Sequence, residues 1–141
     1  MKSQLSFPVS DKKLCGKISF FHRERYTYDT AFESFEEIKI KLSVPRRLGV
    51  TFAGLEVFNE TLDRIVHETH GEWARLDFGY DEYEFSFPAK VIGVGLFFIR
   101  FHVLAQGGSL YGTRFGESIL FDALPKTYGL VQITVSEFQY D

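Results

Sequence analysis

Short apolar runs separated by turn-forming residues are the feature of this sequence that most limits its fold. Residues 38–42 read Ile-Lys-Ile-Lys-Leu, so apolar and charged side chains alternate strictly. A period of two places Ile38, Ile40 and Leu42 on one face of a strand and the lysines on the other. About eight such runs recur at the spacing of a sandwich or barrel. The pattern therefore predicts an all-β, antiparallel fold of about eight strands.

Residues 73–78 and 83–87 are predicted to form a hairpin, with its turn at residues 79–82. Alternation assigns every second residue of both strands to the core. The side chains predicted to face inward are Ala74, Leu76, Phe78, Tyr83, Phe85 and Phe87.

Residues 94–103 form the longest apolar run, and Arg100 and His102 in its second half mark the face in contact with solvent. In the strand predicted over residues 50–58, Gly54 indicates a bulge or a close backbone approach. Residues 132–136 are a further alternating strand. The core side chains predicted from the longest run are Phe97, Ile99, Phe101 and Val103.

Two segments depart from this pattern. Residues 1–16 mix polar side chains with Pro8 and Gly16, so we expect a tether or a loosely held leading strand before a domain over residues 17–141. Residues 30–33, Thr-Ala-Phe-Glu, fit a capping box, and the apolar spacing after them is typical of a helical turn, so we expect no more than a short helix there.

Composition and charge narrow the classes of function. A chain of 141 residues suits one domain, and its 16 Phe and 7 Tyr favour strands, on which aromatic rings pack well. The net charge of −3 without a basic stripe argues against nucleic acid as a partner. No apolar run is long enough to cross a bilayer, so we expect no membrane partner. A single cysteine, Cys15, and the lack of an apolar leader favour the cytoplasm.

Motifs for catalysis, metals or cofactors are weak. The 19 acidic residues fall in turns or at polar strand positions, and no spacing brings two together as glycoside hydrolysis requires. His67 and His70 are three residues apart, whereas the zinc motif on a helix needs four, and Cys15 has no partner at ligand spacing. We therefore predict no catalytic residue, no metal and no cofactor.

Aromatic side chains on predicted solvent faces are the candidates for a binding site. Trp73 shares its predicted face with Arg75, and Phe98 shares one with Arg100. A flat ring flanked by hydrogen-bonding groups suits a sugar, so these four residues are the predicted carbohydrate-binding residues. The simpler interpretation is that the rings pack beneath a loop or against a neighbouring domain.

The order of the runs also resembles that of a known family. The likeness extends over roughly residues 17–141 and depends on segments 22–28, 38–47, 83–87, 95–103, 111–112 and 128–138. The segment 95–103, Gly-Leu-Phe-Phe-Ile-Arg-Phe-His-Val, carries most of it. Together they resemble the N-terminal, starch-binding-type domain of neopullulanases, cyclomaltodextrinases and related glycoside hydrolases of the alpha-amylase family.

That resemblance implies an immunoglobulin-like β-sandwich that precedes a catalytic barrel and helps to dimerise the enzyme or to shape its substrate cleft. The implied partners are an α-glucan or maltooligosaccharide, the enzyme's own catalytic domain and a second copy of the chain. A chain that stops at Asp141 would then be a fragment without the barrel's acids. Phe97 and Ile99 depart from the family, which often carries Tyr there, and its starch-contacting residues are too variable to place here.

Two other functions remain open. The chain could be a stand-alone glucan-binding module that uses its exposed aromatic residues, or an unrelated β-sandwich adaptor that binds another protein.

Overall fold

The alternating segments become strands in the computed structural model, which describes residues 15–106, 108–115, 118–123 and 130–137. The strands are β1 (Cys15–His22), β2 (Arg25–Thr27), β3 (Ala31–Glu33), β4 (Glu37–Pro45), β5 (Phe52–Phe58), β6 (Ile65–His70), β7 (Glu72–Asp77), β8 (Tyr80–Pro88), β9 (Gly95–Ala105), β10 (Gly108–Phe115), β11 (Ser118–Asp122) and β12 (Val131–Ser136). Two short 3-10 helices follow β4 and β8, namely η3 (Arg46–Leu48) and η4 (Ala89–Val91). The all-β prediction is confirmed for the described ranges.

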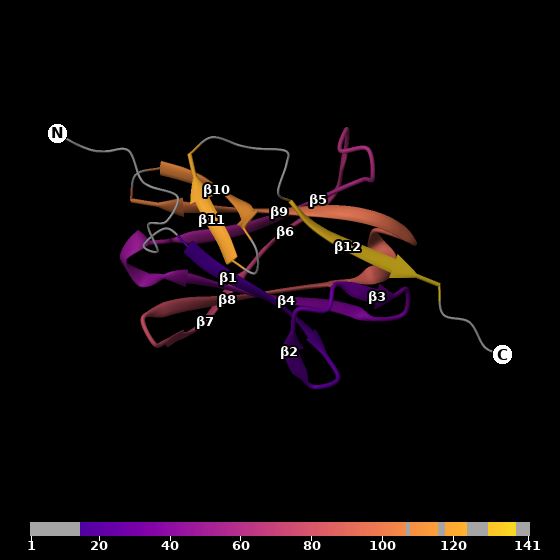
Figure 1. The fold of residues 1–141 in the computed structure, drawn as a ribbon, viewed down its shortest axis with the longest axis horizontal. Coiled ribbons are helices and arrows are strands. Elements are labelled where there is room, and N and C mark those ends of the chain that lie inside the picture. The colour runs from indigo at the N-terminus through magenta and orange to yellow at the C-terminus, as the bar shows by residue number, and fades with distance from the viewer. Residues whose placement is uncertain (1–14, 107, 116–117, 124–129, 138–141) are drawn as a thin grey trace.

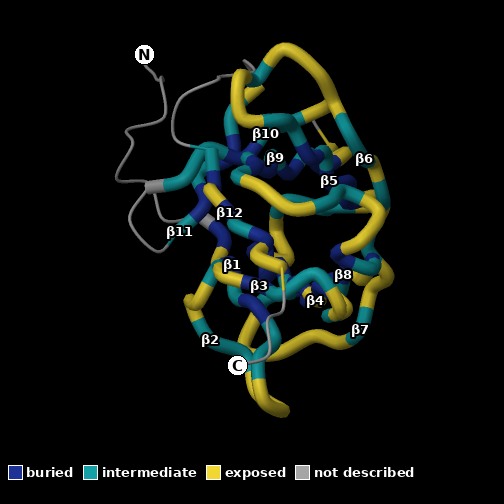
Figure 2. Tube along the Cα trace, turned by 90° about the vertical axis from the view of Figure 1, so that its right-hand side faces the viewer, coloured by how far each residue is buried: buried dark blue, intermediate teal, exposed yellow. Residues whose placement is uncertain are grey.

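In those ranges the strands form one mixed sheet of twelve, in the order β3-β12-β9-β10-β11-β1-β4-β8-β7. Strand β2 pairs with β1, and β5 joins β9 to β6. The sheet folds back on itself, so that β4 and β8 lie in one layer and β5 and β9 in the other (Figures 1 and 2). About eight strands, all antiparallel, were expected. The three-residue strands β2 and β3 are too short to show alternation, and β3 runs parallel to β12.

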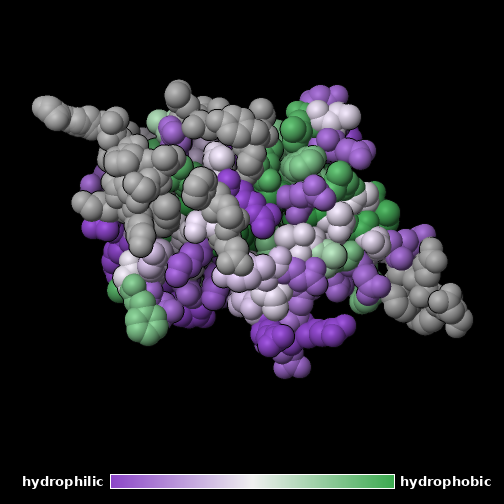
Figure 3. Space-filling view, in the orientation of Figure 1, coloured by the Kyte–Doolittle hydropathy of each residue, from purple (hydrophilic) through white to green (hydrophobic). Residues whose placement is uncertain are grey.

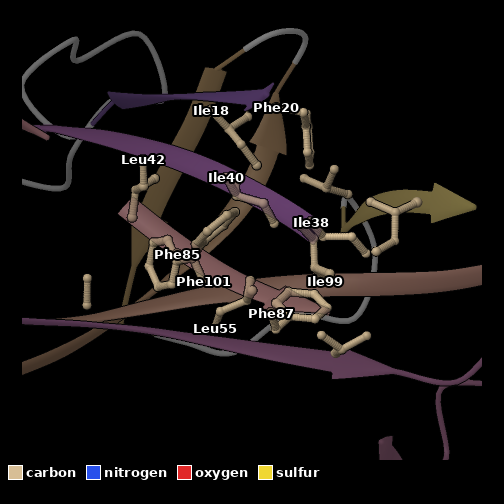
Figure 4. Packing of buried hydrophobic residues seen from close by; sticks show 14 of the residues in the cluster. Ile18, Phe20, Ile38, Ile40, Leu42, Leu55, Phe85, Phe87, Ile99 and Phe101 are labelled. Carbon is tan, nitrogen blue, oxygen red and sulfur yellow. The ribbon is translucent and has the colours of Figure 1, made fainter. Parts of the chain in front are cut away.

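The core lies between the two layers, and the side chains predicted to fill it from β4, β8 and β9 do so. Ile38, Ile40 and Leu42 are fully buried. The rings of Phe85 and Phe101 meet edge to face across the layers, with centroids 5.5 Å apart. Figure 4 shows these side chains converging from both layers. The period-two alternation therefore predicted the buried residues of β4, β8 and β9 correctly. Each of these strands has neighbours on both sides.

Strand β7 breaks the prediction, because Leu76 and Phe78 were expected in the core and are exposed. This strand ends the sheet order and pairs only with β8, so it has no second neighbour to cover it. Its register against β8 also shifts between Trp73 and Arg75, which leaves Ala74 as a bulged residue. The hairpin turn is shorter than expected as well, since β8 already begins at Tyr80.

The short helix for which the sequence left room after Thr30 does not form, because residues 31–33 form β3 instead. The carbonyl of Thr30 accepts a hydrogen bond from the Thr134 amide of β12 at 3.1 Å, and the amide of Ala31 donates to Oδ1 of Asp29 at 2.9 Å. Pairing with a strand distant in sequence thus outweighs the local capping pattern. Phe32 is buried as a result.

Gly54 was expected to mark a bulge or a close backbone approach, but it is a side chain that lies close to it. A Cβ at this position would lie 2.3 Å from Cε1 of His102 on the neighbouring strand β9. Most of the predicted leading segment, residues 1–14, and Gly107 lie outside the described residues. In the part of the chain that is described, no helix has the length and apolar character needed to cross a membrane.

Candidate functional site

Trp73 and Arg75 were predicted to share a strand face, and the bulge at Ala74 separates them. Trp73 pairs with Tyr83, whose side chain points into the core, and its Nε1 donates a hydrogen bond to Oδ1 of Asp81 at 2.9 Å. Arg75 pairs with Glu82, the residue before Tyr83, so its side chain lies on the opposite face of the sheet. The predicted sugar platform of these two residues is therefore not formed, although Trp73 remains 54% exposed.

Arg75 of β7 contacts carboxylates of the neighbouring strand β8. Its Nη1 donates to Oε1 of Glu82 at 2.5 Å, and its Nη2 lies 3.7 Å from Oε2 of Glu84. The hydrogen bond with Glu82 and that residue's charge raise the pKa of Arg75 above its ordinary value. Glu82 itself is buried, and Lys41 of β4 approaches it to 3.8 Å. Arg75 and Lys41 thus hold the same carboxylate.

Phe98 and Arg100 lie on the outward face of β9, where both are half-buried. The guanidinium of Arg100 donates to Oε1 of Glu56 on β5 at 2.7 and 2.8 Å. It also lies over two rings, those of Phe58 and Tyr111, at 5.3 and 4.8 Å from their centroids. The Arg100 side chain is therefore held by Glu56 and by two rings on this face of the sheet. Its interactions favour the interpretation that these rings pack against neighbouring groups.

The two predicted pairs of site residues do not meet. Strand β7 ends one layer, whereas β9 lies at the centre of the other (Figure 1). The two pairs of residues therefore lie in different layers of the fold.

A hollow of about 250 Å³ opens instead on the face of β1, β4 and β8 that points away from the core. We call it the outer hollow; it is lined by Lys17, Ile18, Ser19, Tyr28, Lys41, Ser43, Asp77, Phe78, Tyr80 and Glu82. Sequence reasoning missed it. Alternation does assign Lys17, Ser19, Lys41 and Ser43 to outward positions, but it does not say that β1, β4 and β8 lie side by side.

Two lysine side chains on this face each lie near a tyrosine ring. Nζ of Lys17 lies 5.2 Å from the ring centroid of Tyr80, and Nζ of Lys41 lies 4.5 Å from that of Tyr26. Such contacts hold the ammonium groups near the rings while leaving their N–H donors available. Burial raises the pKa of Tyr26, and the charge of Glu84 raises it further.

Two carboxylates, those of Asp77 and Glu82, line the same hollow, although sequence spacing gave no reason to expect acids to converge. Glu82 is engaged by Arg75 and Lys41, as described above. The outer hollow thus combines acceptors, ammonium donors and ring faces. That combination can bind a polar molecule with apolar patches.

His67 and His70, three residues apart in the sequence, contact different aromatic rings. The ring of His67 packs on Phe87 in the core, with centroids 5.0 Å apart, while that of His70 stacks on Phe52. Cys15 begins β1, and its side chain lies outside the described residues. Within those residues, no three side chains of His, Cys, Asp or Glu gather in a way that could hold a metal ion.

A second hollow, of about 460 Å³, lies beside β2 and β3. Its lining mixes Arg23 and Arg25 with acidic side chains, and Nε2 of its single ring, His22, donates a hydrogen bond to the carbonyl of Asp29 at 2.7 Å. It lacks the aromatic faces of the outer hollow.

No protein-family model matches this sequence, and no curated protein matches it either.

Proposed function

We propose that this chain is a non-catalytic accessory domain of an α-glucan-hydrolysing enzyme of the alpha-amylase type, and that it holds the glucan in the outer hollow. In this proposal the folded-back sheet is an immunoglobulin-like sandwich. The resemblance over residues 83–87 and 95–103 supports the family. These segments lie in strands β8 and β9, one in each layer (Figure 1). The observation that carries the binding role is the convergence of Tyr28, Phe78 and Tyr80 with charged groups.

A glucan has the chemistry that such a lining would recognise. Its sugar rings offer apolar C–H patches to aromatic faces, and its hydroxyls can donate to Asp77 or accept from Lys17. The outer hollow is smaller than the roughly 300–1,000 Å³ of pockets that enclose drug-sized ligands. We therefore expect a shallow site of low affinity that positions part of a chain.

In the whole enzyme, the domain would contact its own catalytic domain or a second copy while presenting the glucan. The opposite layer offers a surface for such contacts, because Phe52 and Leu104 pair across β5 and β9 and are both exposed. Apolar side chains exposed side by side favour protein contacts. The outer hollow would then remain open to sugar.

The test of binding is a titration of the purified chain with maltoheptaose, followed by NMR chemical shifts. We expect saturation with a Kd of about 1 mM, equivalent to roughly 4 kcal/mol. Tyr28→Ala should weaken binding about fivefold, because the exposed ring contributes a stacking face. Trp73→Ala is the matched control: it also removes an exposed aromatic residue, but outside the hollow, and should leave the Kd unchanged.

Shifts that never saturate, or a Trp73→Ala variant that loses binding while Tyr28→Ala keeps it, would contradict the role of the outer hollow. Cellopentaose separates α-glucan binding from general sugar binding and should bind more weakly. The non-catalytic part of the proposal has its own assay. Release of reducing sugar from maltoheptaose by the purified chain would exclude it.

A further inference from the structure

Phe78 occupies the least favourable position in this fold for a phenylalanine. It is 95% exposed and is the first of the two residues that join β7 to β8. Its φ is +48° and that of Gly79 is +82°, so both central residues are in the left-handed region, as in a type I′ turn. Asn, Asp and Gly favour that region, whereas a bulky side chain with positive φ is strained there.

Among the described residues, no hydrogen bond or ring contact requires an aromatic side chain at this position. The turn is fixed by its backbone, since the Arg46 amide at the start of η3 donates to the carbonyl of Gly79 at 2.9 Å. The other turn with two positive φ values, between β1 and β2, carries the charged residues Arg23 and Glu24. Figure 3 shows hydrophilic surface at that β1–β2 turn, but a hydrophobic projection at the corner where β7 and β8 meet. Strain and exposure together favour a functional origin for the ring.

Phe78 stands between two hollows. One is the outer hollow, and the other, of about 400 Å³, lies at the start of η3. We call this hollow of about 400 Å³ the η3 hollow; it is distinct from the one beside β2 and β3, and its lining is Pro45, Arg46, Arg47, Phe78, Gly79 and Tyr80. Since Phe78 and Tyr80 line both, the hollows adjoin at these two rings. A linear ligand longer than one hollow would therefore cross Phe78.

We propose that Phe78 determines the chain length that this site selects, by stacking on a sugar unit where the two hollows adjoin. A glucan of several units lies across both hollows, with its hydroxyls near Arg46 and Arg47 at the far end. A disaccharide occupies the outer hollow and gains little from the ring. This inference rests on the proposed function, and it adds the substrate class: linear oligosaccharides in preference to maltose.

The experiment compares the wild-type chain, Phe78→Asn and Phe78→Tyr. Binding of maltose and of maltoheptaose is measured by NMR titration, and thermal unfolding by circular dichroism. For Phe78→Asn, the affinity for maltoheptaose should fall about fivefold, and that for maltose by a clearly smaller factor. Its melting temperature should rise by about 3 °C, because Asn suits a type I′ turn. Phe78→Tyr retains a ring and should keep wild-type affinity.

Each other outcome counts against one specific claim. If the wild-type chain does not bind maltoheptaose, the proposed function fails and this inference with it. If wild type binds and Phe78→Asn binds equally well, or loses maltose and maltoheptaose alike, the proposed function stands and the chain-length role is overturned. A melting temperature for Phe78→Asn that does not rise would show that Phe78 serves the fold, which also overturns the inference.

Discussion

At Gly54, side-chain size is tightly limited. The ring of His102 lies over its backbone and is flanked by the rings of Phe52 and Tyr111, with centroids 5.7 and 6.0 Å away. Nδ1 of His102 is buried and makes no hydrogen bond to any of the described residues. The ring therefore has little room to move if a larger residue replaces the glycine.

We predict that Gly54→Ala lowers the free energy of unfolding by about 1–3 kcal/mol, because its Cβ would overlap the His102 ring. Urea denaturation provides the measurement. The double-mutant cycle with His102→Ala is the control: removing the ring should remove most of the cost of the alanine. An equal cost in both backgrounds would mean that the penalty arises elsewhere.

Alkaline pH should destabilise the chain through two tyrosines. Burial raises the pKa of Tyr83 above its ordinary 10.0, with a smaller contribution from Asp81, and burial likewise raises that of Tyr26. Because the folded state holds these protons more tightly than the unfolded state, their contribution is complete below pH 10.0 and is lost as pH rises through the folded pKa values.

Urea denaturation at several values between about pH 8 and 11, a range that spans the ordinary tyrosine pKa of about 10, measures this loss of unfolding free energy. Tyr83→Phe should cost about 1 kcal/mol at neutral pH, since the Tyr83 hydroxyl donates to the carbonyl of Val50 at 3.2 Å. It should also flatten the alkaline decline. An unchanged pH dependence in Tyr83→Phe would assign the decline to other groups.

At the scale of elements, two-residue turns and one bulge decide where side chains point. The β1–β2 turn uses Arg23 and Glu24, both with positive φ and neither with the usual turn chemistry. A search for Asn-Gly or Asp-Gly pairs does not find this turn. At Ala74, one extra residue moves Trp73 to the face opposite Arg75. Strict alternation fails at such points because it assumes an unbroken register.

Glu24→Gly is predicted to stabilise the chain by roughly 0.5–1 kcal/mol, because glycine adopts the φ of +69° without strain. Thermal unfolding is the readout. The control is Glu68→Gly, the same change at an exposed position within β6, which should destabilise because a strand there gains nothing from glycine's freedom. A loss of stability in Glu24→Gly would contradict the account of this turn.

For the whole molecule, stability depends on the contact between layers rather than on the exposed aromatic residues. Phe85→Ala is predicted to cost about 3–5 kcal/mol, because it removes the ring that meets Phe101 across the core. That is a large share of the roughly 5–15 kcal/mol that stabilises a typical domain. Phe78→Ala, the same change at an exposed site, should shift unfolding by about 0.5 kcal/mol or less in urea. Similar losses of unfolding free energy in both variants would contradict the view that the contact between the layers, rather than the exposed rings, stabilises the fold.

The sequence by itself determined the strands and their inward residues in β4, β8 and β9, because period-two alternation reflects a local property of the pleat. It marked Gly54 as an exception within its strand, but it did not predict the His102 ring that lies over it. Only the tertiary structure decided that residues 31–33 pair with β12 instead of forming a helix, and that Trp73 and Arg75 part at a bulge. It alone assembled the outer hollow. Strand neighbours such as β1, β4 and β8 are chosen by burial across the whole fold, and no local pattern carries that information.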